Sequence, residues 1–122
     1  MGRLGEPLDA LERAIMGPEV IEEEHKKVIY IAGPVTGVER YWEPFEAAQD
    51  EIEAMGFIAL TPTRQPKGMS NEQYMRICMA MIDSADVAAF LPDFRDSYGA
   101  RIEFYYCEYI EKEIRYLKDG DY

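Results

Sequence analysis

Short apolar runs alternate along the chain with segments whose apolar residues recur at helical spacing. Residues 28–32, 57–60, 86–91 and 114–117 are largely apolar and predict strands that are buried in a sheet. Strands that alternate with helices pair in parallel through right-handed crossovers. The pattern therefore predicts a three-layer α/β fold of the Rossmann or flavodoxin-like class, with a parallel sheet of about four to five strands.

Three helices are predicted between these strands. The first carries a buried stripe of Phe45, Ala48, Ile52 and Met55 and ends at Gly56. Ser70 and Gln73 form a capping box that begins the second helix. The third helix is expected to begin near Ser97, a residue type that caps helices well.

Residues 1–27 differ from the rest of the chain. Leu4, Leu8, Leu11 and Ile15 are spaced as on one helical face, and Gly17-Pro18 ends that pattern. We expect an N-terminal helical extension over residues 1–27, packed on the domain or on a second subunit, with a lid over the ligand as the alternative. Residues 28–122 then form the main domain.

The charge and composition exclude several classes of partner. The formal charge of −11 argues against a broad nucleic-acid surface, although backbone N–H groups can still hold one phosphate. No apolar run approaches the roughly 20 residues that a membrane helix needs, and no secretory signal is evident. Cys78 and Cys107 lack metal-type spacing. We expect a cytoplasmic protein without a metal or other cofactor, bound neither to nucleic acid nor to membrane.

Two loops should meet at the carboxyl edge of the sheet, where open parallel sheets bind ligands. The first follows the first strand and offers a ligand-binding set of Gly33, Pro34, Thr36, Gly37 and Arg40. Its glycines let the backbone approach a ligand, although a plain tight turn explains them as well.

The second loop follows the third strand and leads into a helix. Asp96, Ser97 and Gly99 lie at its start, where the helix dipole favours an anion. Glu103 shares a face with Gly99 and apolar residues, and a buried carboxylate is costly unless it is paired or used. The alternative is that Glu103 rims the sheet and bonds a backbone amide.

Together, Ala-Gly-Pro-x-Thr-Gly after the first strand and Asp-Ser-x-Gly-Ala-x-x-Glu after the third resemble the nucleoside 2-deoxyribosyltransferase-like superfamily, in particular its short uncharacterised bacterial and phage members. The resemblance covers about residues 28–117. It implies that Glu103 attacks the sugar C1′ and that Tyr30 orients Glu103. It also implies that Ser97 contacts the phosphate of 5′-monophosphates and that the loop from Gly33 to Gly37 lines the nucleotide site.

One departure from the family concerns the acid that protonates the leaving base. Characterised relatives carry an aspartate eight residues before the aspartate that opens the third strand, which is Asp86 here, and that position is Cys78. A thiol on an apolar helix face is a poor acid and fits a core role. Asp83, Asp93 and Asp96 are substitute acids, whereas Asp86 is expected to fix the start of its strand. Bulky residues also follow Glu103: Phe104, Tyr105 and Tyr106.

The leading hypothesis is a nucleoside or nucleotide N-glycosidase or 2-deoxyribosyltransferase. Its partner is a small-molecule nucleoside or nucleotide. The alternative is a non-catalytic nucleotide-binding module, such as a sensor or a phage accessory protein, that uses the same cleft. A third hypothesis is a purely structural oligomer, since the nine tyrosines and the N-terminal extension suit a homodimer or a higher homo-oligomer.

Overall fold

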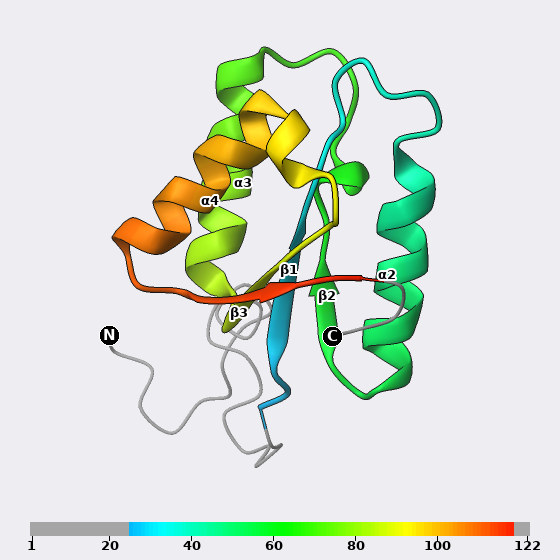
Figure 1. Ribbon diagram of the computed structural model, residues 1–122, viewed down its shortest axis with the longest axis vertical. Helices are drawn as coiled ribbons and strands as arrows, with labels where there is room; N and C mark the ends of the chain where they lie inside the picture. The colour runs from blue at the N-terminus through cyan, green and yellow to red at the C-terminus, as the bar shows by residue number, and fades with distance from the viewer. Residues whose placement is uncertain (1–24, 119–122) are drawn as a thin grey trace, which may run out of the picture.

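A four-stranded parallel sheet forms the centre of the protein in the computed structural model, which describes residues 25–118 (Figure 1). The strands are β1 (Val28–Ala32), β2 (Ile58–Leu60), β3 (Val87–Phe90) and β4 (Glu113–Tyr116). The α-helices of this range are α2 (Trp42–Ala54), α3 (Asn71–Ser84) and α4 (Tyr98–Tyr109), with short 3₁₀ helices η1 (Pro62–Arg64) and η2 (Phe94–Asp96). The elements predicted over residues 28–117 are confirmed, whereas the predicted N-terminal helix lies outside the described residues.

The strand order is β2-β1-β3-β4, and every neighbouring pair is parallel. Tyr30 at the middle of β1 lies opposite Leu60 of β2 on one side and Ala88 of β3 on the other. The chain moves outward from β1 to β2 and then crosses back to β3, so its direction reverses between β1 and β3. This is the switch point at which open parallel sheets bind ligands. The flavodoxin-like α/β fold is confirmed, with four strands in the described range.

The helices cover the two faces of the sheet unequally, with α2 on one face and both α3 and α4 on the other (Figure 1). Side chains alternate along a strand, so Ile29 and Ile31 pack on the α2 side, whereas Tyr30 and Ala32 pack on the α3 and α4 side. Tyr30 is completely buried there. The alternation of β1 thus places one polar group, the Tyr30 hydroxyl, beneath the two-helix layer.

Local hydrogen bonds fix where the helices and β3 begin. The Ser70 hydroxyl accepts from the Gln73 N–H at 3.1 Å, and the Gln73 side chain accepts from the Ser70 N–H at 2.9 Å, which confirms the capping box. Asp86 accepts from the Val28 N–H at 2.8 Å and donates its own N–H to the Val28 carbonyl at 2.8 Å. Asp86 therefore ties the start of β3 to β1, as expected from the sequence.

The predicted burial of Met55 is wrong. Met55 is the C-cap that follows the last residue of α2, and 48% of its surface is exposed. The helical spacing that groups it with Ile52 continues past the last residue that packs on the sheet. Gly56 follows with a φ of +89°, a left-handed conformation that turns the chain away towards β2.

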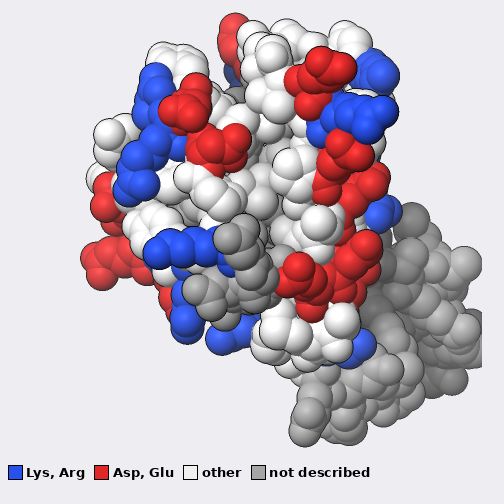
Figure 2. Space-filling model, turned by 45° about the vertical axis from the view of Figure 1, so that its right-hand side comes forward, with Lys and Arg blue, Asp and Glu red and all other residues white. Residues whose placement is uncertain are grey.

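The outer side of α2 is strongly acidic. Its exposed carboxylates form a strip along the helix that Figure 2 shows: Glu43, Glu46, Asp50, Glu51 and Glu53. Such a surface repels the phosphates of a nucleic acid. Within residues 25–118 no helix has the length and apolarity needed to cross a membrane.

Candidate functional site

A hydrogen bond between β1 and α4 lies at the centre of the candidate site. The Tyr30 hydroxyl donates to Oε1 of Glu103 at 3.1 Å, although the two residues are 73 positions apart in the chain. Glu103 lies in the second turn of α4 and is only 6% exposed. The alternative in which Glu103 rims the sheet and bonds a backbone amide is therefore wrong, because this carboxyl group is buried and bonded to a phenol.

Cys78 of α3 completes a buried polar group with Tyr30 and Glu103. Its thiol is close enough to both side chains to affect the pKa values of Tyr30 and Glu103, as they affect its own. Cys78 also packs in the apolar cluster that contains Tyr30, which agrees with a core role. The structure thus brings together the position that carries an acid in the relatives and the glutamate, but here the residue is a thiol.

Burial raises the pKa of Glu103 from 4.5 to about 7, while hydrogen bonds from Tyr30 and Cys78 act to lower it. Burial, together with the neighbouring Glu103 carboxylate, raises the pKa of Cys78 to about 12. Burial likewise raises the pKa of Tyr30 well above its usual value. At neutral pH the site therefore holds two neutral donors and a carboxyl group close to its titration midpoint.

This arrangement suits a carboxylate that is oriented and kept poorly solvated. A carboxylate shielded from bulk water is a better nucleophile than a solvated one, and the hydrogen bond from Tyr30 fixes its orientation. The Cys78 thiol, with its pKa near 12, cannot serve as a general acid near neutral pH, because a useful acid has a pKa near the working pH. The geometry thus provides a buried carboxyl group that Tyr30 orients.

The loop after β1 is shaped by a close backbone approach at Gly33. A Cβ at Gly33 would lie 2.5 Å from Cδ1 of Leu91, the residue after β3, so only glycine fits here. Pro34 is buried beside it, and Thr36 and Gly37 are exposed at the turn, where Gly37 has a φ of +77°. This loop therefore lies against the end of β3, at the switch point of the sheet.

Arg40 lies on the surface at the end of the same loop. Its guanidinium is 3.7 Å from the Glu43 carboxylate, both side chains are exposed, and its backbone has a φ of +53°. The structure thus pairs this predicted ligand-binding residue with the first turn of α2. Its role in binding stays a prediction.

The start of α4 forms the other side of the switch point. The Ser97 hydroxyl accepts from the Ala100 N–H at 3.2 Å, so it caps the helix as predicted. Asp96 is exposed in η2, and its N–H donates to the Asp93 carbonyl at 3.0 Å. A Cβ at Gly99 would meet Met75 at an ordinary 3.6 Å, so its small size is not required by packing.

The bulky residues after Glu103 point in different directions. Tyr105 is 64% exposed, and the Tyr106 hydroxyl donates to Asp83 at 2.5 Å on the surface between α4 and α3. Phe104 packs with Phe90 and Phe94 on the side of α4 that faces β4. Asp83, one of the substitute acids, is therefore bonded to Tyr106.

Comparison with known proteins places the chain in a family and shows its fold among solved structures. A solved structure of a 2-deoxyribosyltransferase from Bacillus psychrosaccharolyticus matches with a TM-score of 0.61 and 18% identity, over 73% of this chain and 70% of that one. At this identity the match shows a common fold. No curated protein sequence matches the chain. Residues 27–116 match the family described as domain of unknown function DUF4406, so the chain belongs to that family.

Proposed function

We propose that the protein is a nucleoside or nucleotide N-glycosidase or 2-deoxyribosyltransferase that acts at the sugar C1′ through Glu103. The buried hydrogen bond between Tyr30 of β1 and Glu103 of α4 is the observation that supports the proposal most strongly. The fold common to the chain and a solved 2-deoxyribosyltransferase supports the ligand class.

In the proposed reaction a carboxylate oxygen of Glu103 forms a bond to C1′ while the N-glycosidic bond breaks. The electron pair of that bond leaves with the base, which takes a proton from solvent. The resulting glycosyl ester is then attacked at C1′ by water or by a second base, and Glu103 departs as a carboxylate. The attacking group loses its proton to solvent. This double displacement follows the logic of retaining glycosidases, with a carboxylate as nucleophile.

The other predicted residues have supporting roles in this proposal. Tyr30 orients the carboxylate, while Gly33, Pro34, Thr36 and Gly37 line the sugar and base from the β1 side. Asp96, Ser97 and Gly99 contact the ligand from the α4 side, where backbone N–H groups favour an anionic 5′-phosphate. Arg40 would leave Glu43 to reach that phosphate. The reduced, buried cysteines agree with a cytoplasmic site of action.

A non-catalytic nucleotide-binding module is the second candidate. Two observations favour it: Cys78 occupies the position of the expected acid, and Glu103 is only 6% exposed. Either function is compatible with a homodimer or higher homo-oligomer, which we also propose. Tyr98 and Tyr109 on the outside of α4 are 74% and 85% exposed, and aromatic side chains of this kind are enriched at interfaces.

Release of free base from a panel of ribo- and deoxyribonucleosides and their 5′-monophosphates tests the proposal. Chromatography of the products should show base release by the natural protein and none by Glu103→Gln. Glu108→Gln, an exposed position on the same helix, is the matched control and should behave like the natural protein. Binding of the same compounds without any base release would favour the binding module, and equal release by Glu103→Gln would exclude the glutamate nucleophile.

A further inference from the structure

An open groove lies at the carboxyl ends of β3 and β4, and neither Tyr30 nor Glu103 lines it. It has a volume of about 520 Å³. Its lining comes from two segments, the end of β3 with the residues after it (Phe90–Pro92, Phe94 and Arg95) and Ile114–Lys118 along and after β4. The groove is open to solvent on one side, and its volume lies within the range of about 300–1,000 Å³ that small-molecule sites cover.

Basic side chains dominate the polar lining of this groove. Arg95, Arg115 and Lys118 all line it, and within residues 25–118 none of the lining residues is acidic. Nη2 and Nε of Arg115 lie 2.6 Å and 2.8 Å from Oε2 of Glu113, so this guanidinium is already paired with a carboxylate. Arg95 and Lys118 are therefore the cations that we expect to bind an anion. Asp93 and Asp96 flank Arg95 in the chain but do not line the groove. In a chain of net charge −11, such a cluster is a local exception.

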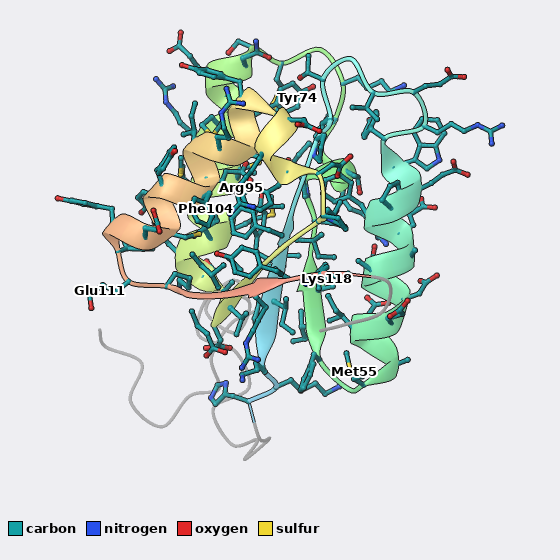
Figure 3. The ribbon with its side chains drawn as sticks, in the orientation of Figure 1. Met55, Tyr74, Arg95, Phe104, Glu111 and Lys118 are labelled. Atoms are coloured by element: carbon teal, nitrogen blue, oxygen red, sulfur yellow. The ribbon has the colours of Figure 1, made fainter. Side chains whose placement is uncertain are left out.

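Arg95 is held in place by aromatic rings. Its guanidinium lies 4.5 Å from the centre of the Phe94 ring and within 6.0 Å of the Phe104 and Tyr116 rings. Figure 3 shows Arg95 beside Phe104 on α4 and Lys118 at the end of β4. The cation–π contacts restrict the guanidinium without using its N–H donors, so the donors stay available for an anion.

The groove also offers a flat surface next to these cations. The centres of the Tyr116 and Phe94 rings are 6.1 Å apart, with an angle of 30° between the ring planes, and Tyr116 is 47% exposed. A planar ring can stack on the free side of Tyr116 while a phosphate reaches the cations.

We infer that this groove, the β3–β4 basic pocket, is a second ligand site that binds a phosphorylated small molecule with a flat ring, such as a nucleoside monophosphate. Arg95 and Lys118 hold the phosphate, and Tyr116 stacks on the ring. The inference does not depend on the proposed chemistry, because Arg95 and Glu103 lie on different sides of α4: Glu103 contacts β1, whereas Arg95 packs with Phe104 towards β4.

We test the inference by titrating the full chain with AMP and following the NMR chemical shifts of its backbone amides. Adenosine is the matched compound without a phosphate, and inorganic pyrophosphate is the matched compound without a ring. AMP should shift the amides of residues 90–95 and 114–118. Arg95→Gln and Lys118→Gln should each weaken that binding by about tenfold, as expected for loss of a charge-assisted phosphate contact. Arg76→Gln on α3, an exposed cation paired with Glu72, is the control and should leave it unchanged.

Arg95→Gln loses the contacts of Arg95 with the aromatic rings, and this loss can unfold the protein. In that case Lys118→Gln alone tests the inference. Glu103→Gln should leave the AMP shifts at residues 114–118 intact, which separates this pocket from the proposed catalytic site. The inference is overturned if AMP produces no shifts at residues 90–95 and 114–118. It is equally overturned if Lys118→Gln binds AMP there as tightly as the natural protein, or if adenosine binds there as well as AMP.

Discussion

The Tyr30 hydroxyl donates a hydrogen bond to the Glu103 carboxyl at 3.1 Å across the boundary between β1 and α4. Both groups are buried, and burial raises the pKa of Glu103 to about 7. The ionisation of this one carboxyl group therefore links the stability of the fold to the proposed chemistry, and both can be measured as a function of pH.

The first prediction concerns activity and pH. The proposed nucleophile is the carboxylate, so kcat/KM for base release should rise with pH through an apparent pKa near 7 and then level off. Tyr30→Phe removes a hydrogen bond that lowers the pKa of Glu103, so its acidic limb should move to higher pH. A rate profile from pH 5 to 9 for both proteins measures this shift. An unchanged limb in Tyr30→Phe would show that Tyr30 does not act on Glu103.

The second prediction concerns stability and pH. The folded pKa of Glu103 lies above its unfolded value, so its stabilising contribution is complete below about pH 4.5 and is lost as the pH rises through about 7. Relative to Glu103→Gln, the natural protein should thus lose roughly 1–3 kcal/mol of unfolding free energy between pH 5 and pH 8. Urea denaturation at both pH values measures the difference. Identical pH dependence in the two proteins would mean that Glu103 is not buried as described.

The third prediction tests whether Cys78 only packs in the core or also acts as the general acid. Cys78→Ala should keep base release within about threefold of the natural rate, because a thiol with a pKa near 12 transfers no proton near neutral pH. It should cost about 1–2 kcal/mol of stability through the small cavity that it leaves. Steady-state rates and chemical denaturation give the two values. A loss of activity by about a hundredfold in a folded variant would assign a catalytic step to Cys78.

The fourth prediction compares two glycines at the switch point. Gly33→Ala should destabilise the fold by about 1–3 kcal/mol, because its Cβ would lie 2.5 Å from Leu91. Gly99→Ala meets only an ordinary contact at 3.6 Å and should leave stability within about 0.5 kcal/mol. If Gly99 lines the ligand site as proposed, this variant should still weaken nucleotide binding. Thermal denaturation and titration calorimetry of both variants measure these effects, and equal stability losses would contradict the packing argument.

The sequence predicts the order of elements and the parallel sheet because apolar runs and helical stripes alternate without interruption from Val28 onward. It fails at Met55, because spacing alone does not show where a helix leaves the sheet. The contact between Tyr30, Cys78 and Glu103 depends on three separate elements, so spacing could indicate Glu103 as unusual but not what it touches. The sequence does not predict the β3–β4 basic pocket, because Arg95 and Lys118 line one groove only when β4 pairs with β3.

The central claim is that Glu103 forms a bond to the sugar C1′. Its most direct measurement is mass spectrometry of the protein after incubation with the panel of nucleosides and 5′-monophosphates, including 2′-fluoro analogues that slow breakdown of a glycosyl ester. The account predicts free base together with a sugar-sized mass increase on the peptide that contains Glu103, and neither product in Glu103→Gln. Base release with the adduct on another residue, or an equal adduct in Glu103→Gln, would contradict it.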